Sequence, residues 1–191
     1  MSSLYKGFIM TKDKKALMSF KGKSSSELLT LEQAQRFPEF AGILADNTVL
    51  VDIDDEAQSQ ILLNIVTNKQ LKCKVYKTSR GCHFLFRTDR PMTNRTHCKL
   101  AIGLTADIKD GGKASYQVLK YDGKEREVLY DAGEYQYLPK YLTPIKSNMD
   151  VIGMGNGDGR NNALFSYILP LQKNEFTVEE CKECIQVIND F

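Results

Sequence analysis

The sequence predicts an α+β fold, built on a sheet of mixed or antiparallel strands with flanking helices. Several short strand-like runs are interspersed with two or three segments of helical spacing, which favours this class over a repeat or a helix bundle. Hydrophobic residues make up 42% and charged residues 26% of the 191 positions, an ordinary globular composition. This length suits one domain with a sizeable core, or one domain and part of a second.

The first part of the chain is expected to open with a β-hairpin and to continue through a helix into a central strand. Its elements are strands at 5–10 and 16–20, a helix at 26–36, a strand at 48–53 and a helix at 57–68. The polar turn 11–14 joins the first two strands. Thr30 and Gln33 form a capping-box pattern, and Pro38 marks the end of the first helix.

The second part is expected to add a hairpin, further strands and a helical end. Its elements are strands at 74–78 and 82–87, a helix at 94–100, strands at 102–109 and 114–121, and amphipathic helices at 163–172 and 178–188. The Gly-rich run 153–159 is typical of a linker. We therefore expect a main domain over 1–147, a linker over 148–160 and the start of a helical domain over 161–191, in a fragment of a longer protein.

Composition and charge predict an intracellular protein. The amino terminus has scattered lysines and no apolar core of the signal-peptide type, and no apolar run is long enough to span a bilayer. Five cysteines form an odd set without framework spacing, which favours reduced thiols in a cytosol. The net charge of +2 does not predict nucleic-acid binding. Lysine-rich stretches at 12–23 and 69–80 are either solvated faces or part of a phosphate-facing groove.

The central strand carries the first candidate site, because it is an apolar run that ends in acids spaced two apart. Side chains alternate along a strand, so Asp52 and Asp54 point to one side. Two carboxylates held close together repel each other unless a divalent cation lies between them, and hard cations such as Mg²⁺ or Mn²⁺ prefer oxygen ligands. The alternative is that Asp54, Asp55 and Glu56 cap the following helix.

The turn before the strand at 82–87 is the second candidate. Ser79, Arg80 and Gly81 supply a hydroxyl group, a guanidinium group and an accessible backbone N–H, which are the groups that gather around a phosphate. His83 follows directly. Its alternative role is that of a hydrogen-bonded core or edge histidine, which is the commoner fate of a single histidine.

The third candidate is the end of the strand at 102–109. Asp107 follows an apolar run as Asp52 does, and Lys109 lies two residues further on the same face. A third carboxylate could complete a metal site, and a lysine beside it could neutralise a triphosphate. Alternatively, Asp107 and Lys109 pair with each other and have no further role.

This ordered set of motifs resembles the catalytic core of the archaeo-eukaryotic primase superfamily, particularly the primase-polymerases of phages and plasmids. That family has an apolar strand ending in Asp-x-Asp, a strand with a small-x-His motif after a Ser/Gly turn, and a third strand ending in a carboxylate. The resemblance implies that Asp52, Asp54 and Asp107 are catalytic acids that hold two Mg²⁺ or Mn²⁺ ions. Gly81-Cys82-His83 would be the small-x-His element, and the residues implied in nucleotide binding are Ser79, Arg80, His83 and Lys109.

Arg80 departs from the family pattern, which often has a small residue there, so its role is either that of a phosphate ligand or that of a surface residue. Lys109 and Asp110-Gly111-Gly112 resemble the Lys-containing, Gly-rich turn that follows the third carboxylate. Gly159 to Phe165 looks like the start of the helical domain that follows the catalytic domain in many phage primases. The resemblance covers roughly residues 5–145 and depends on the ordered combination of short motifs.

The resemblance implies an RRM-like catalytic core and a DNA-templated nucleotidyltransferase that synthesises primers, with DNA polymerase activity as an option. Implied partners are a single-stranded DNA template, nucleoside triphosphates and a helicase domain or partner beyond Phe191, with no membrane involved. The implied location is the cytoplasm of a bacterial host, for a phage- or plasmid-encoded protein. Alternatives are a metal-dependent nuclease and a catalytically silent replication-initiation or DNA-binding module.

Overall fold

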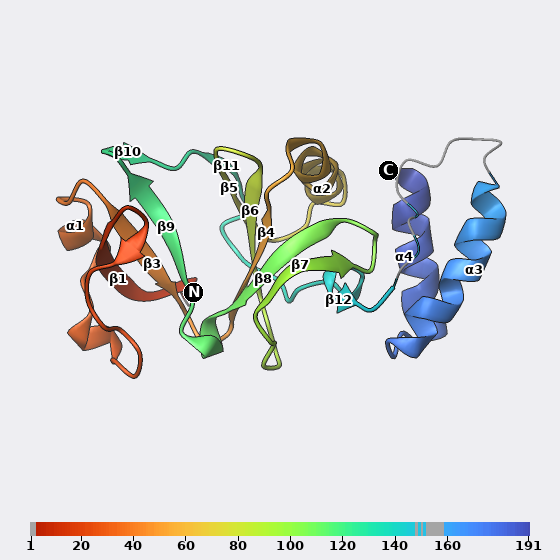
Figure 1. Ribbon diagram of the computed structural model, residues 1–191, viewed down its shortest axis with the longest axis horizontal. Helices are drawn as coiled ribbons and strands as arrows, with labels where there is room; N and C mark the ends of the chain where they lie inside the picture. Colours follow the sequence, from red (N-terminus) through yellow and green to blue (C-terminus); the bar gives the residue numbers. More distant parts are fainter. Residues whose placement is uncertain (1–2, 148, 150, 152–158) are drawn as a thin grey trace.

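The computed structural model describes residues 3–147, 149, 151 and 159–191, and within them it confirms the α+β class (Figure 1). Two antiparallel sheets lie side by side. The N-terminal sheet has the order β10 (Lys124–Glu125), β9 (Tyr116–Tyr121), β3 (Phe40–Leu44), β1 (Tyr5–Lys12) and β2 (Lys15–Ala16). The central sheet has the order β11 (Val128–Asp131), β5 (Lys74–Lys77), β6 (Cys82–Arg87), β4 (Thr48–Ile53), β8 (Thr105–Asp110), β7 (Arg95–Leu100) and β12 (Pro144–Ile145).

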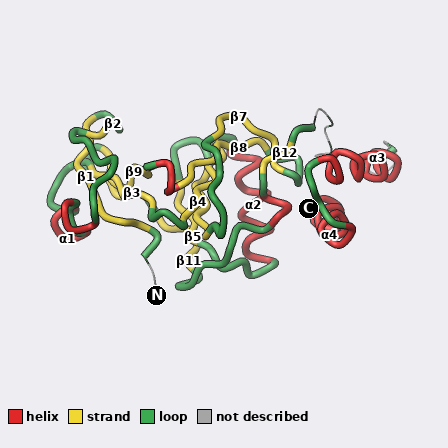
Figure 2. The backbone as a smooth tube through the Cα atoms, turned by 90° about the horizontal axis from the view of Figure 1, so that it is seen from below, coloured by secondary structure: helices red, strands yellow, loops and turns green. Residues whose placement is uncertain are grey.

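Helices lie on the side of the central sheet that faces away from the N-terminal sheet. These helices are α2 (Glu56–Asn68), α3 (Arg160–Lys173) and α4 (Val178–Asp190). Figures 1 and 2 show α3 and α4 at the end of the molecule opposite the N-terminal sheet, in two perpendicular views. Among the described residues, no helix is both long and apolar enough to cross a membrane.

Two predictions for the N-terminal part are wrong in extent. The second hairpin strand, predicted at 16–20, is confined to the two residues of β2. The helix predicted at 26–36 is replaced by the 3₁₀ turn η1 (Ser25–Glu27) and the short helix α1 (Leu31–Ala34). The capping box of Thr30 and Gln33 is nevertheless present, at the start of α1.

A backbone pairing with β1 explains why the helix is interrupted. Leu29 and Phe8 exchange two backbone hydrogen bonds of 2.9 and 3.0 Å. This pairing requires extended backbone between η1 and α1, and it buries Leu28 against the outer face of the N-terminal sheet. Tertiary pairing therefore overrides the local helical pattern.

The helix predicted at 94–100 is wrong, because this segment forms strand β7. It pairs with β8 on one side and with β12 on the other. Half of its side chains are exposed and only Leu100 is buried, so it has no continuous apolar face of the kind that stabilises a helix on a core. The pairing is irregular between Arg95 and Cys98, where His97 adopts a left-handed backbone with φ of 52°.

The two faces of the central sheet are buried in different cores. On one face, alternate residues such as Val51 of β4 and Phe84 of β6 pack with the helices. On the other face, Leu50 and Leu85 pack with Phe40 and other apolar residues of the N-terminal sheet. β4 is therefore buried along its whole length. A polar side chain on either face must form hydrogen bonds or ion pairs with polar partners.

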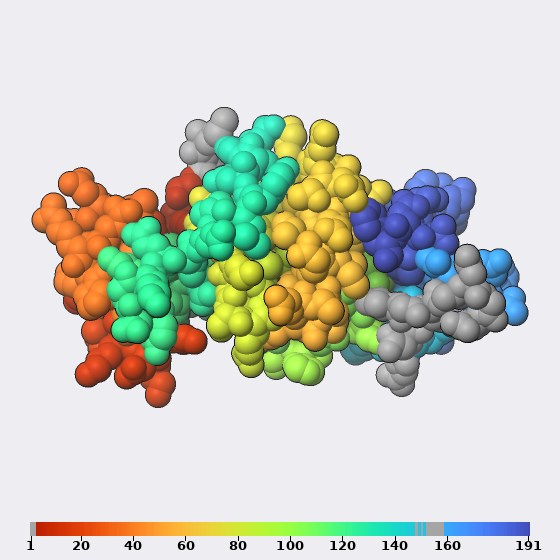
Figure 3. All heavy atoms as spheres, turned by 90° about the horizontal axis from the view of Figure 1, so that it is seen from above, coloured from red at the N-terminus to blue at the C-terminus, as the bar shows by residue number. Residues whose placement is uncertain are grey.

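The segment from β9 to β11 connects the two sheets. β9 pairs with β3 in the N-terminal sheet, and β11 pairs with β5 in the central sheet. Figure 3 shows this part of the chain, in teal, lying across the junction between the red and orange N-terminal part and the yellow central part. The relative position of the sheets is thus fixed by continuous chain as well as by side-chain packing.

The two predicted C-terminal helices are confirmed as α3 and α4, which pack on the helical face of the central sheet. Leu171, Cys184 and Val187 belong to the same hydrophobic cluster as Val51 and Phe84. The buried Tyr167 hydroxyl donates a hydrogen bond of 2.9 Å to the carbonyl oxygen of Ala101, which follows β7. Of the predicted linker over 148–160, residues 148, 150 and 152–158 lie outside the described residues.

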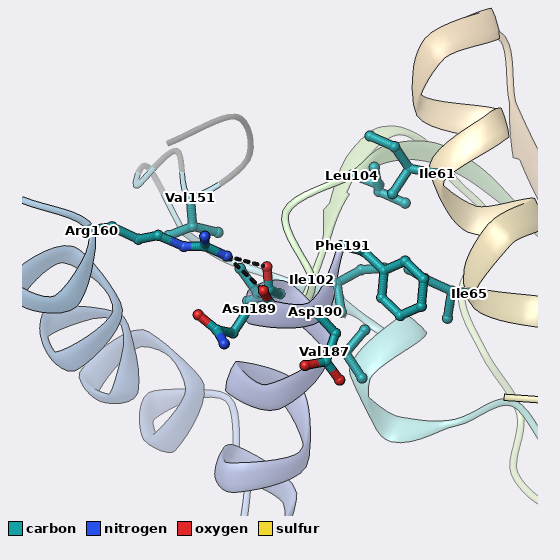
Figure 4. A pocket seen from close by; sticks show the side chains of 11 residues that line it. Ile61, Ile65, Ile102, Leu104, Val151, Arg160, Val187, Asn189, Asp190 and Phe191 are labelled. Atoms are coloured by element: carbon teal, nitrogen blue, oxygen red, sulfur yellow. Dashed lines mark hydrogen bonds between the residues drawn. The ribbon is translucent and has the colours of Figure 1, made fainter. Parts of the chain in front are cut away.

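A pocket of about 300 Å³ lies where the end of α4 meets α2 (Figure 4). Its lining is largely apolar and includes Ile61 and Ile65 of α2 and Val187 of α4. At its edge Arg160, the first residue of α3, donates hydrogen bonds of 3.1 and 2.9 Å to the carbonyl oxygens of Ile188 and Asn189. Arg160 therefore joins the start of one C-terminal helix to the end of the other.

We predict that Tyr167→Phe lowers the free energy of unfolding by about 1 kcal/mol, because the buried carbonyl of Ala101 loses its hydroxyl donor. Tyr137→Phe is the matched control, since Tyr137 is 62% exposed and should tolerate the change. Urea unfolding followed by circular dichroism measures both variants. An unchanged value for Tyr167→Phe would contradict the docking of α3 on the central sheet.

Candidate active site

Strand register places three of the predicted site residues in one row across the central sheet. Asp52 of β4 lies directly opposite His83 of β6 on one side and opposite Asp107 of β8 on the other. Residues opposite each other in antiparallel strands share a face, with Cβ atoms about 4.5–5.5 Å apart. The pairing therefore brings Asp107 beside Asp52, although 54 residues of sequence lie between these two aspartates.

The row opens into a cavity of about 770 Å³ between the two sheets. The residues predicted from sequence all line it: Asp52, Asp54, Ser79, Arg80, His83, Asp107 and Lys109. The opposite wall comes from the N-terminal sheet and the chain after β9, and it includes Tyr116, Gln117 and Arg126. Ser79 and Arg80 are exposed at the cavity, whereas Asp52 and His83 are buried.

Asp52 is a buried and ionised carboxylate. Its side chain is 10% exposed, and Lys109 Nζ donates a hydrogen bond of 2.8 Å to its Oδ2. His83 Nε2 lies 3.2 Å from its Oδ1. Burial raises the pKa of a carboxyl group, but the nearby His83 and Lys109 outweigh burial and hold the pKa of Asp52 well below its ordinary value.

His83 is held between Asp52 and a residue of the other sheet. The Tyr5 hydroxyl donates a hydrogen bond of 2.6 Å to Gln117 Oε1, so the Gln117 amide nitrogen is left to donate to His83 Nδ1, 2.9 Å away. Burial lowers the pKa of His83 and outweighs the opposing effect of Asp52. The ring is therefore neutral, and its hydrogen lies on Nε2, at the edge that faces Asp52.

A glycine makes this contact between the sheets geometrically feasible. Gly42 of β3 lies opposite Gln117 in the register of β3 and β9. A Cβ atom at Gly42 would lie 2.5 Å from Cδ1 of Tyr5, so any side chain there would displace the ring. The missing side chain lets the Tyr5 ring cross β3 and place its hydroxyl against Gln117.

The turn that follows β5 is closed by Thr78 and pressed against the end of β4. Thr78 Oγ1 accepts hydrogen bonds from the backbone N–H groups of Arg80 and Gly81, at 3.3 and 2.9 Å. A Cβ atom at Gly81 would lie 2.0 Å from the carbonyl oxygen of Ile53. The small residue of the small-x-His motif thus has a steric reason, because it lets this turn approach the Asp-bearing strand.

The remaining carboxylates each have a partner. Arg80 makes an ion pair of 2.5 Å with Asp54, and the helix-cap role falls to Asp55, whose Oδ1 accepts a bond of 2.8 Å from Gln58 N–H. Asp107 Oδ1 accepts a bond of 2.8 Å from the backbone N–H of His97, in the irregular part of β7. Lys109 pairs with Asp52, so the alternative in which it pairs with Asp107 is not what the structure has.

Sequence reasoning missed residues that come from outside the three motifs. Arg126 lines the cavity, and its guanidinium donates to the carbonyl oxygens of Val118 at 2.6 Å and Lys77 at 3.3 Å. Burial lowers the pKa of Arg126, against the effect of the nearby Asp52 and Asp54. Gln117 is the second residue of β9 and lies between Tyr116 and Val118, and a polar residue in such a place was the one signal that could have identified it.

The chemistry of the lining suits a hard cation and a polyanion. Within the described ranges, no three His, Cys, Asp or Glu side chains are arranged to hold a metal ion. Lys109 and Arg80 are paired with Asp52 and Asp54. The atoms that could bind a metal ion here are nevertheless carboxylate oxygens, which hard cations prefer. Among the residues described, the buried Asp52 Oδ1 has no aligned hydrogen-bond donor. The cationic residues that line the cavity are Lys14, Arg80, Arg95, Lys109 and Arg126.

No family model, curated protein or solved structure matches this chain.

We predict that Gly81→Ala lowers the free energy of unfolding by about 1–3 kcal/mol, because its Cβ atom would displace the end of β4. Gly112→Ala is the matched control: the nearest atoms to an added Cβ are 3.6 Å away, so the change should stay within about 0.5 kcal/mol. Chemical denaturation measures both. Equal effects would show that Gly81 is not required for the close approach.

We also predict that Gln117→Leu and Tyr5→Phe each lower the free energy of unfolding by about 1–3 kcal/mol, since each leaves buried polar atoms without their partner. In the double variant, the loss of unfolding free energy should be about 1 kcal/mol smaller than the sum of the two single losses. The reason is that both changes break the same Tyr5–Gln117 hydrogen bond. A double-mutant cycle from urea unfolding measures this coupling. Strictly additive losses would contradict the network.

Proposed function

We propose that this chain is a DNA-templated nucleotidyltransferase of the primase-polymerase type, which synthesises primers with Mg²⁺ or Mn²⁺. The observation that carries the proposal is the meeting of the three motifs in one cavity, with Asp52 in register between His83 and Asp107. Membership of the archaeo-eukaryotic primase superfamily is part of this proposal. Each motif alone has a structural explanation, whereas their convergence gives paired acids and cations in one solvent-accessible space.

The acids and the cations have separate roles in this proposal. Asp52, Asp54 and Asp107 would hold two divalent ions, which when bound lower the pKa of an attacking 3′-hydroxyl group and neutralise the leaving pyrophosphate. Arg126 would contact a phosphate from a position fixed by two backbone carbonyls. Lys109 and Arg80 carry positive charge on long, partly exposed side chains that can reach a triphosphate.

His83 would act as a hydrogen-bond donor. Its Nδ1 accepts from Gln117, so the hydrogen of the neutral ring lies on Nε2 at the cavity. This N–H group faces Asp52 in the structure. With Asp52 bound to a divalent ion it would donate to a phosphate oxygen, and Nε2 would have no lone pair with which to remove a proton. Its contribution is therefore electrostatic stabilisation by a preorganised donor, which is the role that a phosphoryl-transfer site requires.

Single-stranded DNA would approach along the cationic side of the cavity. Arg95 is exposed on β7 next to the row of site residues, and Lys14 lies at the tip of the β1–β2 hairpin. Contacts of this kind are made to phosphates, so template affinity should fall steeply as salt rises. Nucleoside triphosphates and a single-stranded template are accordingly the proposed ligands.

We predict that the protein extends primers on a labelled single-stranded template with Mg²⁺ or Mn²⁺ and nucleoside triphosphates. Asp52→Asn and Asp107→Asn should each reduce product formation by at least about 100-fold, because each removes charge from the reacting centre. Asp122→Asn is the matched control: Asp122 is exposed in a turn with φ of 49°, a backbone conformation that asparagine accepts.

Gel electrophoresis of the labelled products separates the alternatives. We expect the wild type and the Asp122→Asn control to lengthen the labelled strand. Neither Asp52→Asn nor Asp107→Asn should do so. Shortening of the labelled strand would identify a metal-dependent nuclease instead. Primer synthesis that survives in Asp52→Asn would exclude this cavity as the catalytic centre.

A further inference from the structure

We propose that Lys109 and Arg80 are exchangeable counter-ions of the site. Without a ligand they occupy Asp52 and Asp54, and a polyphosphate must take them over before these acids accept a divalent cation. This inference rests on the proposed function and adds to it a control on when the cation binds. It assigns to two side chains of this chain a role in excluding a cation that arrives without its polyphosphate.

The ion pairs fill the positions that a cation would need. Lys109 Nζ is 2.8 Å from Asp52 Oδ2, and Arg80 is 2.5 Å from Asp54 Oδ2. The other oxygen of Asp52, Oδ1, is buried and lies 3.2 Å from His83 Nε2 without an aligned hydrogen bond. A bare divalent ion at Asp52 would therefore have to displace a protein ammonium group from the same carboxylate.

The two cationic side chains can leave without disturbing the fold. The Lys109 side chain is 35% exposed and that of Arg80 is 70% exposed, and such partly solvated pairs are held weakly. Arg126 differs, because its guanidinium is bound to the backbone of Val118 and Lys77. Of these three cations, one is thus fixed and two can move.

Exchange couples the two ligands. When a polyphosphate binds Lys109 and Arg80, Asp52 and Asp54 lose their counter-ions, and their affinity for a divalent cation rises. When a cation binds the acids, both basic side chains are released and are available to phosphate oxygens. Because coupling of binding free energies is reciprocal, each ligand strengthens the other by the same factor.

The test compares two probes on Lys109→Met: Mn²⁺ alone and a preformed complex of Mn²⁺ with inorganic tripolyphosphate. Binding of Mn²⁺ is followed by the loss of its paramagnetic resonance signal, and binding of the complex by calorimetry. Lys109→Met should bind bare Mn²⁺ about fivefold more tightly and the complex about fivefold more weakly, as expected for a partly exposed ion pair. A rise in the affinity for bare Mn²⁺ together with a fall in the affinity for the complex is the result that counter-ion exchange predicts.

Lys113→Met is the matched control, because it removes the same charge from an exposed residue that does not line the cavity. Both affinities should stay at the wild-type value. Arg80→Met repeats the test at a side chain that is 70% exposed, where the change should leave folding intact. It should shift the two probes in the same opposite directions as Lys109→Met.

The outcomes separate this inference from the proposed function. If bare Mn²⁺ binds equally to all variants and only the complex is weakened, Lys109 and Arg80 are phosphate ligands without counter-ion exchange, and the inference is overturned while the site stands. Weaker binding of both probes also overturns it. If neither the wild type nor any variant binds Mn²⁺, alone or with tripolyphosphate, the inference and the proposed metal-dependent function both fall.

Discussion

The site depends on keeping one charged carboxylate, Asp52, inside a buried strand. A buried ionised group is costly unless its oxygens have partners, and apolar residues alone would force it to take up a proton. The partners come from different strands: Lys109 from β8, His83 from β6 and, through His83, Gln117 from β9. In the folded protein, the low pKa of Asp52 therefore depends on residues of two neighbouring strands, and the position of His83 also depends on the docked N-terminal sheet.

This dependence makes the contact between the sheets part of the site. Tyr5 reaches Gln117 only because Gly42 leaves β3 open beneath its ring. Leu50 and Leu85, next to the polar row, are packed against apolar residues of the N-terminal sheet. The apolar packing fixes the distance between the sheets, and the hydrogen-bonded chain uses that distance to fix the His83 ring.

Sequence patterns predicted the parts of this arrangement that depend on residues close together in the chain. The alternation of β4 and β6, the glycine turn before β6 and the Asp-bearing end of β4 follow from neighbouring residues, and register then brings Asp52, His83 and Asp107 together. The prediction that Asp107 ends its strand is wrong, because β8 continues to Asp110. β7 was predicted as a helix because its strand character comes from β8 and β12 on either side. Arg126 and Gln117 could not be assigned, since their partners lie in segments that only tertiary pairing brings close.

The distribution of positive charge is what would let one cavity hold carboxylates and also bind the proposed polyanion. Acids alone would repel phosphates, and fixed cations alone would neutralise the acids permanently. Here the fixed charge of Arg126 is attached to backbone carbonyls, while Lys109 and Arg80 are paired to the acids through partly exposed side chains. In the exchange that we propose, the carboxylates and the cations would become available in the same event, as a ligand that brings a divalent cation and phosphates together would require.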